Sequence, residues 1–155
     1  MKSENRLERV LSQSSKLGLD TSILIYHFEG HTRYGPLTSL IFTAVAEGTE
    51  AVLSSIAVME ILVKPFQAGN PKVLQELIRQ LRNLPNFTFP PVEFATAVEA
   101  ARLRAAYGLR APDALHLATA LLAEADAFIT NDRGFQVVGG KEKIKIVLLE
   151  DSIIN

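Results

Sequence analysis

The chain has 155 residues, of which 48% are hydrophobic and 21% charged, and this length and composition predict a single soluble globular domain. Its formal net charge of -1 gives no overall positive field for nucleic acid, so any contact with nucleic acid must use a local patch. The absence of cysteine excludes disulfides and thiolate metal sites.

The N-terminal region has no apolar segment of the kind that targets or anchors a protein. It lacks the apolar core of a secretory signal, and no apolar run anywhere in the chain approaches the roughly 20 residues that cross a bilayer, so we expect a cytoplasmic protein with no membrane partner. Residues 1–16 form a polar extension ahead of a domain at 17–155. The extension is polar apart from Leu7, Val10 and Leu11, and we interpret it as a frayed helix or a tail without a function of its own.

Strands alternate with helices along the rest of the chain. Short apolar runs predict the strands, and apolar residues that recur every three or four positions predict the helices. In chain order, the elements are a strand at 16–20, helices at 21–28 and 36–47, a strand at 51–54, helices at 55–63 and 70–82, a strand at 86–89, helices at 91–107 and 112–122, and strands at 127–129 and 144–149. This alternation is typical of an α/β fold with a mostly parallel sheet and helices on both faces.

Several residues mark the ends of these elements. Asp20 is suited to capping the helix that follows it. Asn70 followed by Pro71 is a cap and a first-turn proline, whereas Pro65 predicts that the preceding helix ends before it. Lys145 alternates with apolar residues in the last strand, which places that strand at an edge of the sheet.

Four acidic residues stand out by their positions in this pattern. Asp20 ends the first strand, Asp132 directly follows the fourth, and Glu60 lies in the helix after the second strand. Asp113 opens the helix that leads into the fourth strand, and the sequence alone does not fix its side of the sheet. Because ligands of such folds bind beyond the carboxyl ends of the strands, three of the four acids fall at the rim where a site is expected.

Each acid also has an ordinary explanation. Asp20 and Asp132 are suited to capping the segments that follow them, and Asp113 in a first turn complements the helix dipole. Glu60 has Lys64 four residues later, which is typical of a surface ion pair. Taken singly, none of the four identifies a site, and it is their occurrence at one rim that favours one.

Carboxylates gathered in one place need a cation. At a separation of ~4 Å each pair costs about 4 kcal/mol at an effective dielectric constant near 20. Neither cysteine nor a paired-histidine motif is present for zinc, so the oxygen ligands favour Mg²⁺ or Mn²⁺. Such ions polarise phosphoryl oxygens and activate water, and the chemistry indicated is phosphodiester hydrolysis.

The chain resembles a known family, the PIN-domain ribonucleases, and within that family the VapC-like toxins of toxin–antitoxin pairs. The resemblance rests on four motifs that occur in order: Leu-Asp-Thr-Ser at 19–22, Ser-Ser-Ile-Ala-Val-Met-Glu at 54–60, Pro-Asp-Ala-Leu-His-Leu-Ala-Thr-Ala at 112–120 and Thr-Asn-Asp-Arg-Gly-Phe at 130–135. It implies a single PIN-like domain with five parallel strands in the order 3-2-1-4-5. It also implies an endoribonuclease that depends on Mg²⁺ or Mn²⁺, has RNA as its substrate and is restrained by a cognate antitoxin.

The resemblance also implies roles for individual residues. Asp20 and Asp113 would be direct metal ligands, and Glu60 and Asp132 would be further ligands or would position water. The polar positions beside these catalytic acids are Thr21, Thr130 and Asn131.

Some features concern partners rather than chemistry. Three basic residues, Arg110, Arg133 and Lys64, are suited to a local strip that holds RNA phosphates, although scattered surface charge explains them equally. His116 lies one turn after Asp113, within reach of the site, and a hydrogen-bonded core position explains it as well. The apolar faces of the helices at 36–47, 55–63 and 70–82 exceed what one side of a sheet needs, which predicts a homodimer.

Three functions remain open at this stage. The first is the metal-dependent endoribonuclease, and the second is a PIN-like module that binds RNA or protein without catalysis. The third is a doubly wound nucleotide- or phosphoryl-binding domain, which is disfavoured because the chain has no glycine-rich phosphate loop.

Overall fold

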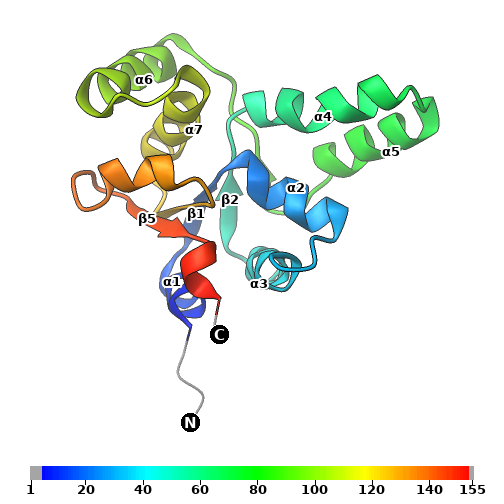
Figure 1. Cartoon of the computed structure of the whole chain (residues 1–155), viewed down its shortest axis with the longest axis horizontal. Helices are drawn as coiled ribbons and strands as arrows, with labels where there is room; N and C mark the ends of the chain where they lie inside the picture. Colours follow the sequence, from blue (N-terminus) through cyan, green and yellow to red (C-terminus); the bar gives the residue numbers. More distant parts are fainter. Residues whose placement is uncertain (1–4, 154–155) are drawn as a thin grey trace.

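The computed structural model describes residues 5–153, so residues 1–4 of the predicted extension and residues 154–155 of the predicted domain lie outside the described residues (Figure 1). Its centre is a sheet of five parallel strands in the order β3-β2-β1-β4-β5. The strands are β1 (Lys16–Leu19), β2 (Glu50–Val52), β3 (Phe87–Thr88), β4 (Ala127–Thr130) and β5 (Lys145–Leu148). The predicted α/β class and strand order are confirmed, and β5 is an edge strand as Lys145 indicated.

The helices lie on both faces of this sheet. They are α1 (Arg6–Gln13), α2 (Thr21–Glu29), α3 (Gly35–Ala46), α4 (Ile56–Ala68), α5 (Pro71–Arg82), α6 (Phe94–Tyr107) and α7 (Ala111–Leu122), with short 3-10 helices η1 (Arg133–Val138) and η2 (Glu150–Ser152). Within residues 5–153, none of them has the length and apolar character needed to cross a membrane.

Alternation along the strands produces two cores. Leu17, Leu19 and Ile129 point to the face covered by α1, α2 and α3, and they are fully buried there. Phe128 is fully buried in a second core together with residues of α6, α7 and η1. In this second core α7 packs against β1, and α6 packs against α7. Each central strand is therefore buried on both sides, as expected of a parallel sheet, and this explains the nearly continuous apolar runs in the sequence.

The two central strands end at the same level. Leu17 pairs with Ala127 and Leu19 with Ile129, and the N–H of Asp20 donates to the carbonyl of Ile129 at 3.0 Å. The residues that follow β1 and β4 therefore emerge side by side at one edge of the sheet.

The predicted N-terminal extension contains a capped and packed helix. The side chain of Asn5 accepts from the N–H of Leu7, and Glu8 completes a capping box. Leu7 and Val10 are buried in the core that contains β1. A helix of eight residues is marginal by itself, so contacts with the domain, which the local sequence does not display, decide that this segment is ordered rather than frayed.

The predicted end of the helix before Pro65 is wrong. Helix α4 continues through Pro65 to Ala68 and ends at Gly69, which adopts a left-handed conformation with φ 70°. Proline removes the N–H that would donate to the carbonyl of Ile61, but α4 packs along α5 as an antiparallel helix pair (Figure 1). This packing favours a continuous helix over the local preference of proline.

Candidate active site

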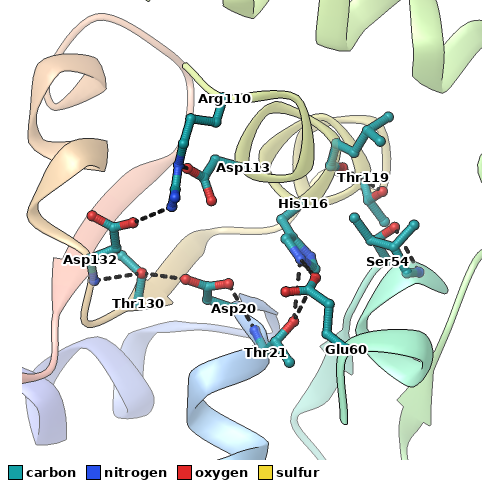
Figure 2. A network of polar contacts seen from close by, with 12 residues as sticks. Asp20, Thr21, Ser54, Glu60, Arg110, Asp113, His116, Thr119, Thr130 and Asp132 are labelled. Carbon is teal, nitrogen blue, oxygen red and sulfur yellow. Dashed lines mark hydrogen bonds and ion pairs between the residues drawn. The ribbon is translucent and has the colours of Figure 1, made fainter. Parts of the chain in front are cut away.

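Four carboxylates from different elements lie together at the carboxyl edge of the sheet (Figure 2). Asp20 follows β1, Asp132 follows β4, Asp113 is in the first turn of α7, and Glu60 projects from α4. The sequence did not fix the side on which Asp113 lies, and the structure places it beside Asp20. These residues come from positions 20 to 132, so the fold rather than local sequence brings them together.

Asp20 is partly buried and is held by two hydrogen bonds. It accepts hydrogen bonds from the N–H of Thr21 at 2.8 Å and from the hydroxyl of Thr130 at 2.7 Å. Burial raises the pKa of the Asp20 carboxyl, and the hydrogen bond from Thr130, the nearby His116 and the hydrogen bond from Thr21 oppose this shift. The negative charge of Asp113 adds a smaller effect that raises the pKa. Asp20 therefore caps α2 as predicted and is also held in a site where its charge is costly.

Arg110 joins two of the other acids. Its Nε lies 2.9 Å from Oδ2 of Asp113, and its Nη2 lies 3.4 Å from Oδ2 of Asp132 (Figure 2). The hydrogen bond and charge of Asp113, then the charges of Asp132 and Asp20, raise the pKa of the guanidinium. Asp132 also caps η1 through the N–H of Gly134 at 2.8 Å.

Glu60 is held by a different partner from the one predicted. Its Oε1 lies 2.6 Å from Nε2 of His116 and 3.3 Å from the hydroxyl of Thr21 (Figure 2). No ion pair joins Glu60 to Lys64 within residues 5–153. The buried imidazole, supplied by a helix 56 residues away in sequence, replaces the surface ion pair that the i,i+4 spacing indicated.

The remaining predicted site residues fall into two groups. Thr130 links two acids, because its hydroxyl donates to Asp20 and accepts from the N–H of Asp132 at 3.0 Å. Asn131 instead contacts the N–H of Glu150 and the hydroxyl of Tyr26, at 3.0 and 3.3 Å. Asn131 therefore links α2, which carries Tyr26, to η2, which begins at Glu150.

Two of the three predicted RNA-contacting residues lie beside this group rather than within it. Arg133, on η1, lies 3.5 Å from Asp151, and Lys64 is exposed on α4. The sequence left two explanations for His116, a role at the site and a core position. It predicted Arg110 only as an RNA contact and not as a partner of Asp113 and Asp132. The spacing of both residues could have indicated these contacts. Arg110 and His116 each lie three positions from Asp113, and residues three apart on a helix lie on the same face.

An apolar groove begins at Glu60. It has a volume of about 850 Å³ and runs between α2, α4 and α5. Its apolar walls are formed by Ile25, Phe28, Ile61, Val63, Val73 and Leu77, and Lys64 and Lys72 are among its charged lining residues. The site edge and the groove are therefore continuous.

The side chains, as they stand, form no ready-made metal cluster. Within residues 5–153 no three histidine, aspartate or glutamate side chains are grouped so as to hold a metal ion. Arg110 neutralises two of the acids and His116 engages Glu60. The donor set still fits Mg²⁺ or Mn²⁺, because the four acids offer only oxygen ligands.

Sequence comparison assigns the family. A family profile described as PIN domain matches residues 18–141, which is most of the chain and contains all four acids. The chain belongs to the PIN domain family. No match was found among curated proteins.

Solved structures resemble this PIN domain along most of its length. A toxin–antitoxin complex from Klebsiella pneumoniae has 27% identity and a TM-score of 0.59, with 84% of this chain and 95% of that chain covered. VapBC2 from Rickettsia felis, bound to a DNA fragment from its promoter, has 15% identity and a TM-score of 0.67, covering 84% and 96%. FitAcB from Neisseria gonorrhoeae has 22% identity and a TM-score of 0.63, covering 87% and 98%. The last two likenesses concern the fold alone.

Proposed function

We propose that the protein is a metal-dependent endoribonuclease that hydrolyses RNA phosphodiester bonds in the cytoplasm and is the toxin of a toxin–antitoxin pair. The observation that carries the proposal is the network of polar contacts that joins Asp20, Glu60, Asp113 and Asp132 at one edge of the sheet (Figure 2). Membership of the PIN domain family and similarity to the toxin–antitoxin complex from Klebsiella pneumoniae support it.

The roles proposed for the four acids are those that the resemblance to PIN-domain ribonucleases implies. Asp20 and Asp113 would bind Mg²⁺ or Mn²⁺ directly, with Glu60 and Asp132 as further ligands or as groups that orient water. When bound, the ion would polarise a phosphoryl oxygen and lower the pKa of water. Thr130 holds the Asp20 carboxylate toward the site through its 2.7 Å hydrogen bond.

Basic residues near the site would hold the RNA. Arg110 has a side chain that is 77% exposed, so it is free to turn from the acids toward a phosphate once a metal ion neutralises them. Arg133 and Lys64 would add contacts to phosphates on either side. The substrate in this proposal is RNA of unspecified sequence.

The groove between α2, α4 and α5 supports an antitoxin as partner. An apolar segment of the antitoxin would fill it and reach Glu60, which would couple binding to inhibition. Val73→Asp places a charge in this groove at a side chain that is already exposed, so the fold should persist. Co-expressed with the cognate antitoxin, this variant should no longer co-purify with it and should keep RNA cleavage.

A homodimer is also part of the proposal. Met59 and Phe66 are exposed apolar side chains on α4, and Phe94 is exposed at the start of α6. Sedimentation should give a dimer at micromolar protein, and Phe66→Glu should shift it toward monomer. A monomer in the parent protein would contradict this part.

Two isosteric variants test the nuclease. Asp20→Asn and Asp113→Asn should reduce Mn²⁺-dependent RNA cleavage to the level without metal, while the melting temperature stays near that of the parent. Asp126→Asn is the matched control, because Asp126 lies before β4 at the opposite end of the sheet and accepts from the N–H groups of Ser15 and Lys16. Cleavage that survives in both site variants would refute the assignment and leave a PIN fold that binds without catalysis.

A further inference from the structure

His116 is a buried polar residue whose polar contacts all lie at the site. Its side chain is 1% exposed, and Nε2 lies 2.6 Å from Oε1 of Glu60 and 3.2 Å from the hydroxyl of Thr21 (Figure 2). Its other nitrogen, Nδ1, is buried and has no hydrogen-bond partner within residues 5–153. The ring is therefore not tied to the backbone or to another part of the core.

The carboxylate partner indicates which atom of the ring donates. An ionised carboxylate only accepts hydrogen bonds, so the hydrogen of the short contact belongs on Nε2, and the Thr21 hydroxyl donates to the same oxygen. Burying an imidazole with one unpaired nitrogen is unfavourable compared with an apolar side chain. Packing alone therefore gives no reason for histidine here, whereas the contact with Glu60 does.

This contact acts on one oxygen of Glu60 and leaves the other free. Oε1 receives both hydrogen bonds, and Oε2 makes none within residues 5–153. The Glu60 side chain is 36% exposed and lies beside an open groove and one turn from Lys64. Without an anchor, this long side chain has other directions in which to turn.

We propose that His116 is a positioning residue that, with Thr21, fixes Glu60 through Oε1 and directs Oε2 to the metal ion or to a water bound to it. The proposal rests on the proposed function. Hydrogen-bonding partners of metal ligands typically change metal affinity by about 10- to 100-fold. We therefore expect His116 to act on metal binding chiefly through Glu60, the acid that it contacts.

The test measures Mn²⁺ binding by isothermal titration calorimetry, together with the melting temperature. His116→Leu should weaken Mn²⁺ binding about 10-fold. His116→Gln should restore most of it, because the glutamine amide nitrogen reaches the position of Nε2. Leu117→Val, a buried change at the next position of α7, controls for lost packing and should lower the melting temperature without changing Mn²⁺ affinity.

A double-variant cycle separates positioning from a general structural role. In a Glu60→Gln background, His116→Leu should have no further effect on Mn²⁺ affinity if it acts through Glu60. Equal Mn²⁺ affinities of parent and His116→Leu would overturn the inference and leave the proposed nuclease standing. A parent protein that binds no Mn²⁺ would overturn both.

Discussion

Gly18 provides the sharpest test of how the fold positions the site. It lies in β1 with its α-carbon facing α7, the helix that carries Asp113 and His116. A Cβ at this position would lie 2.4 Å from the Cβ of Ala120 and 3.1 Å from Cδ2 of Phe128. Carbon atoms in contact prefer about 3.5–4.0 Å, so Gly18→Ala requires α7 to move by roughly 1 Å relative to β1.

The expected cost is that of overpacking. An extra methyl group in a well-packed core typically costs about 1–3 kcal/mol, less a small gain because alanine suits a strand better than glycine. For a domain of this size, each kcal/mol lowers the melting temperature by roughly 2–4 °C. Calorimetry and urea denaturation of Gly18→Ala measure this loss, and Mn²⁺ binding should weaken with it because Asp113 moves with α7.

A second variant isolates the clash. Ala120→Gly removes the atom that a new methyl group at residue 18 would meet, at a cost of about 1 kcal/mol from lower helix propensity. The double variant should then be more stable than the sum of the two single effects by at least about 1 kcal/mol. Rescue will be incomplete because the contact with Phe128 remains. Strictly additive losses would show that β1 and α7 do not meet as the structure has them.

Three further outcomes are expected. Arg110→Gln should tighten Mn²⁺ binding severalfold in calorimetry, because the guanidinium that pairs with Asp113 and Asp132 no longer competes with the ion; unchanged or weaker binding would contradict this. Mn²⁺ at 100 times its dissociation constant should stabilise the protein by about 2.7 kcal/mol, measured as a rise in melting temperature, and no rise would argue against a metal site. Hydrogen bonds from the N–H groups of Lys16 and Ser15 lower the pKa of Asp126. The ionised Asp126 carboxylate therefore stabilises the folded protein at pH values above the ordinary aspartate pKa near 4. This stabilisation is lost as the pH falls through the lowered pKa. The stability difference between the parent and Asp126→Asn should be largest at neutral pH and shrink below about pH 4, and a difference independent of pH would refute this account.

The elements and their order follow from local patterns. Apolar runs that stop at Asp20 and Thr130 mark the carboxyl ends of β1 and β4, and Asn70 with Pro71 marks the start of α5. Because all strands of a parallel sheet have their carboxyl ends at the same edge, a residue that ends a strand in the sequence can be assigned to that edge. The strand order, in contrast, came from the family resemblance, because periodicity does not say which strands are neighbours.

Local rules failed where a tertiary partner outweighed them. Pro65 ends a helix by local preference, yet packing against α5 carries α4 past it. Lys64 stands at the right spacing to pair with Glu60, yet the buried ring of His116 does so instead. A contact across 56 residues leaves no periodic trace in a single sequence.

At the site, too, the positions of the acids follow from the backbone topology, whereas their side-chain partners depend on tertiary contacts. Topology brings the four acids to one edge of the sheet, and strand ends in the sequence marked that edge for three of them. The spacing of Arg110 and His116 from Asp113 indicated that both lie near the acids, but not which acid each would contact. Arg110 contacts Asp113 and Asp132, whereas His116 contacts Glu60. In the proposed function the first would compete with a metal ion for its acids, and the second would hold its acid in place for the ion. Loss of Arg110 should therefore strengthen metal binding and loss of His116 should weaken it. Two changes on the same short segment of chain thus give opposite results, which general damage to the site would not produce.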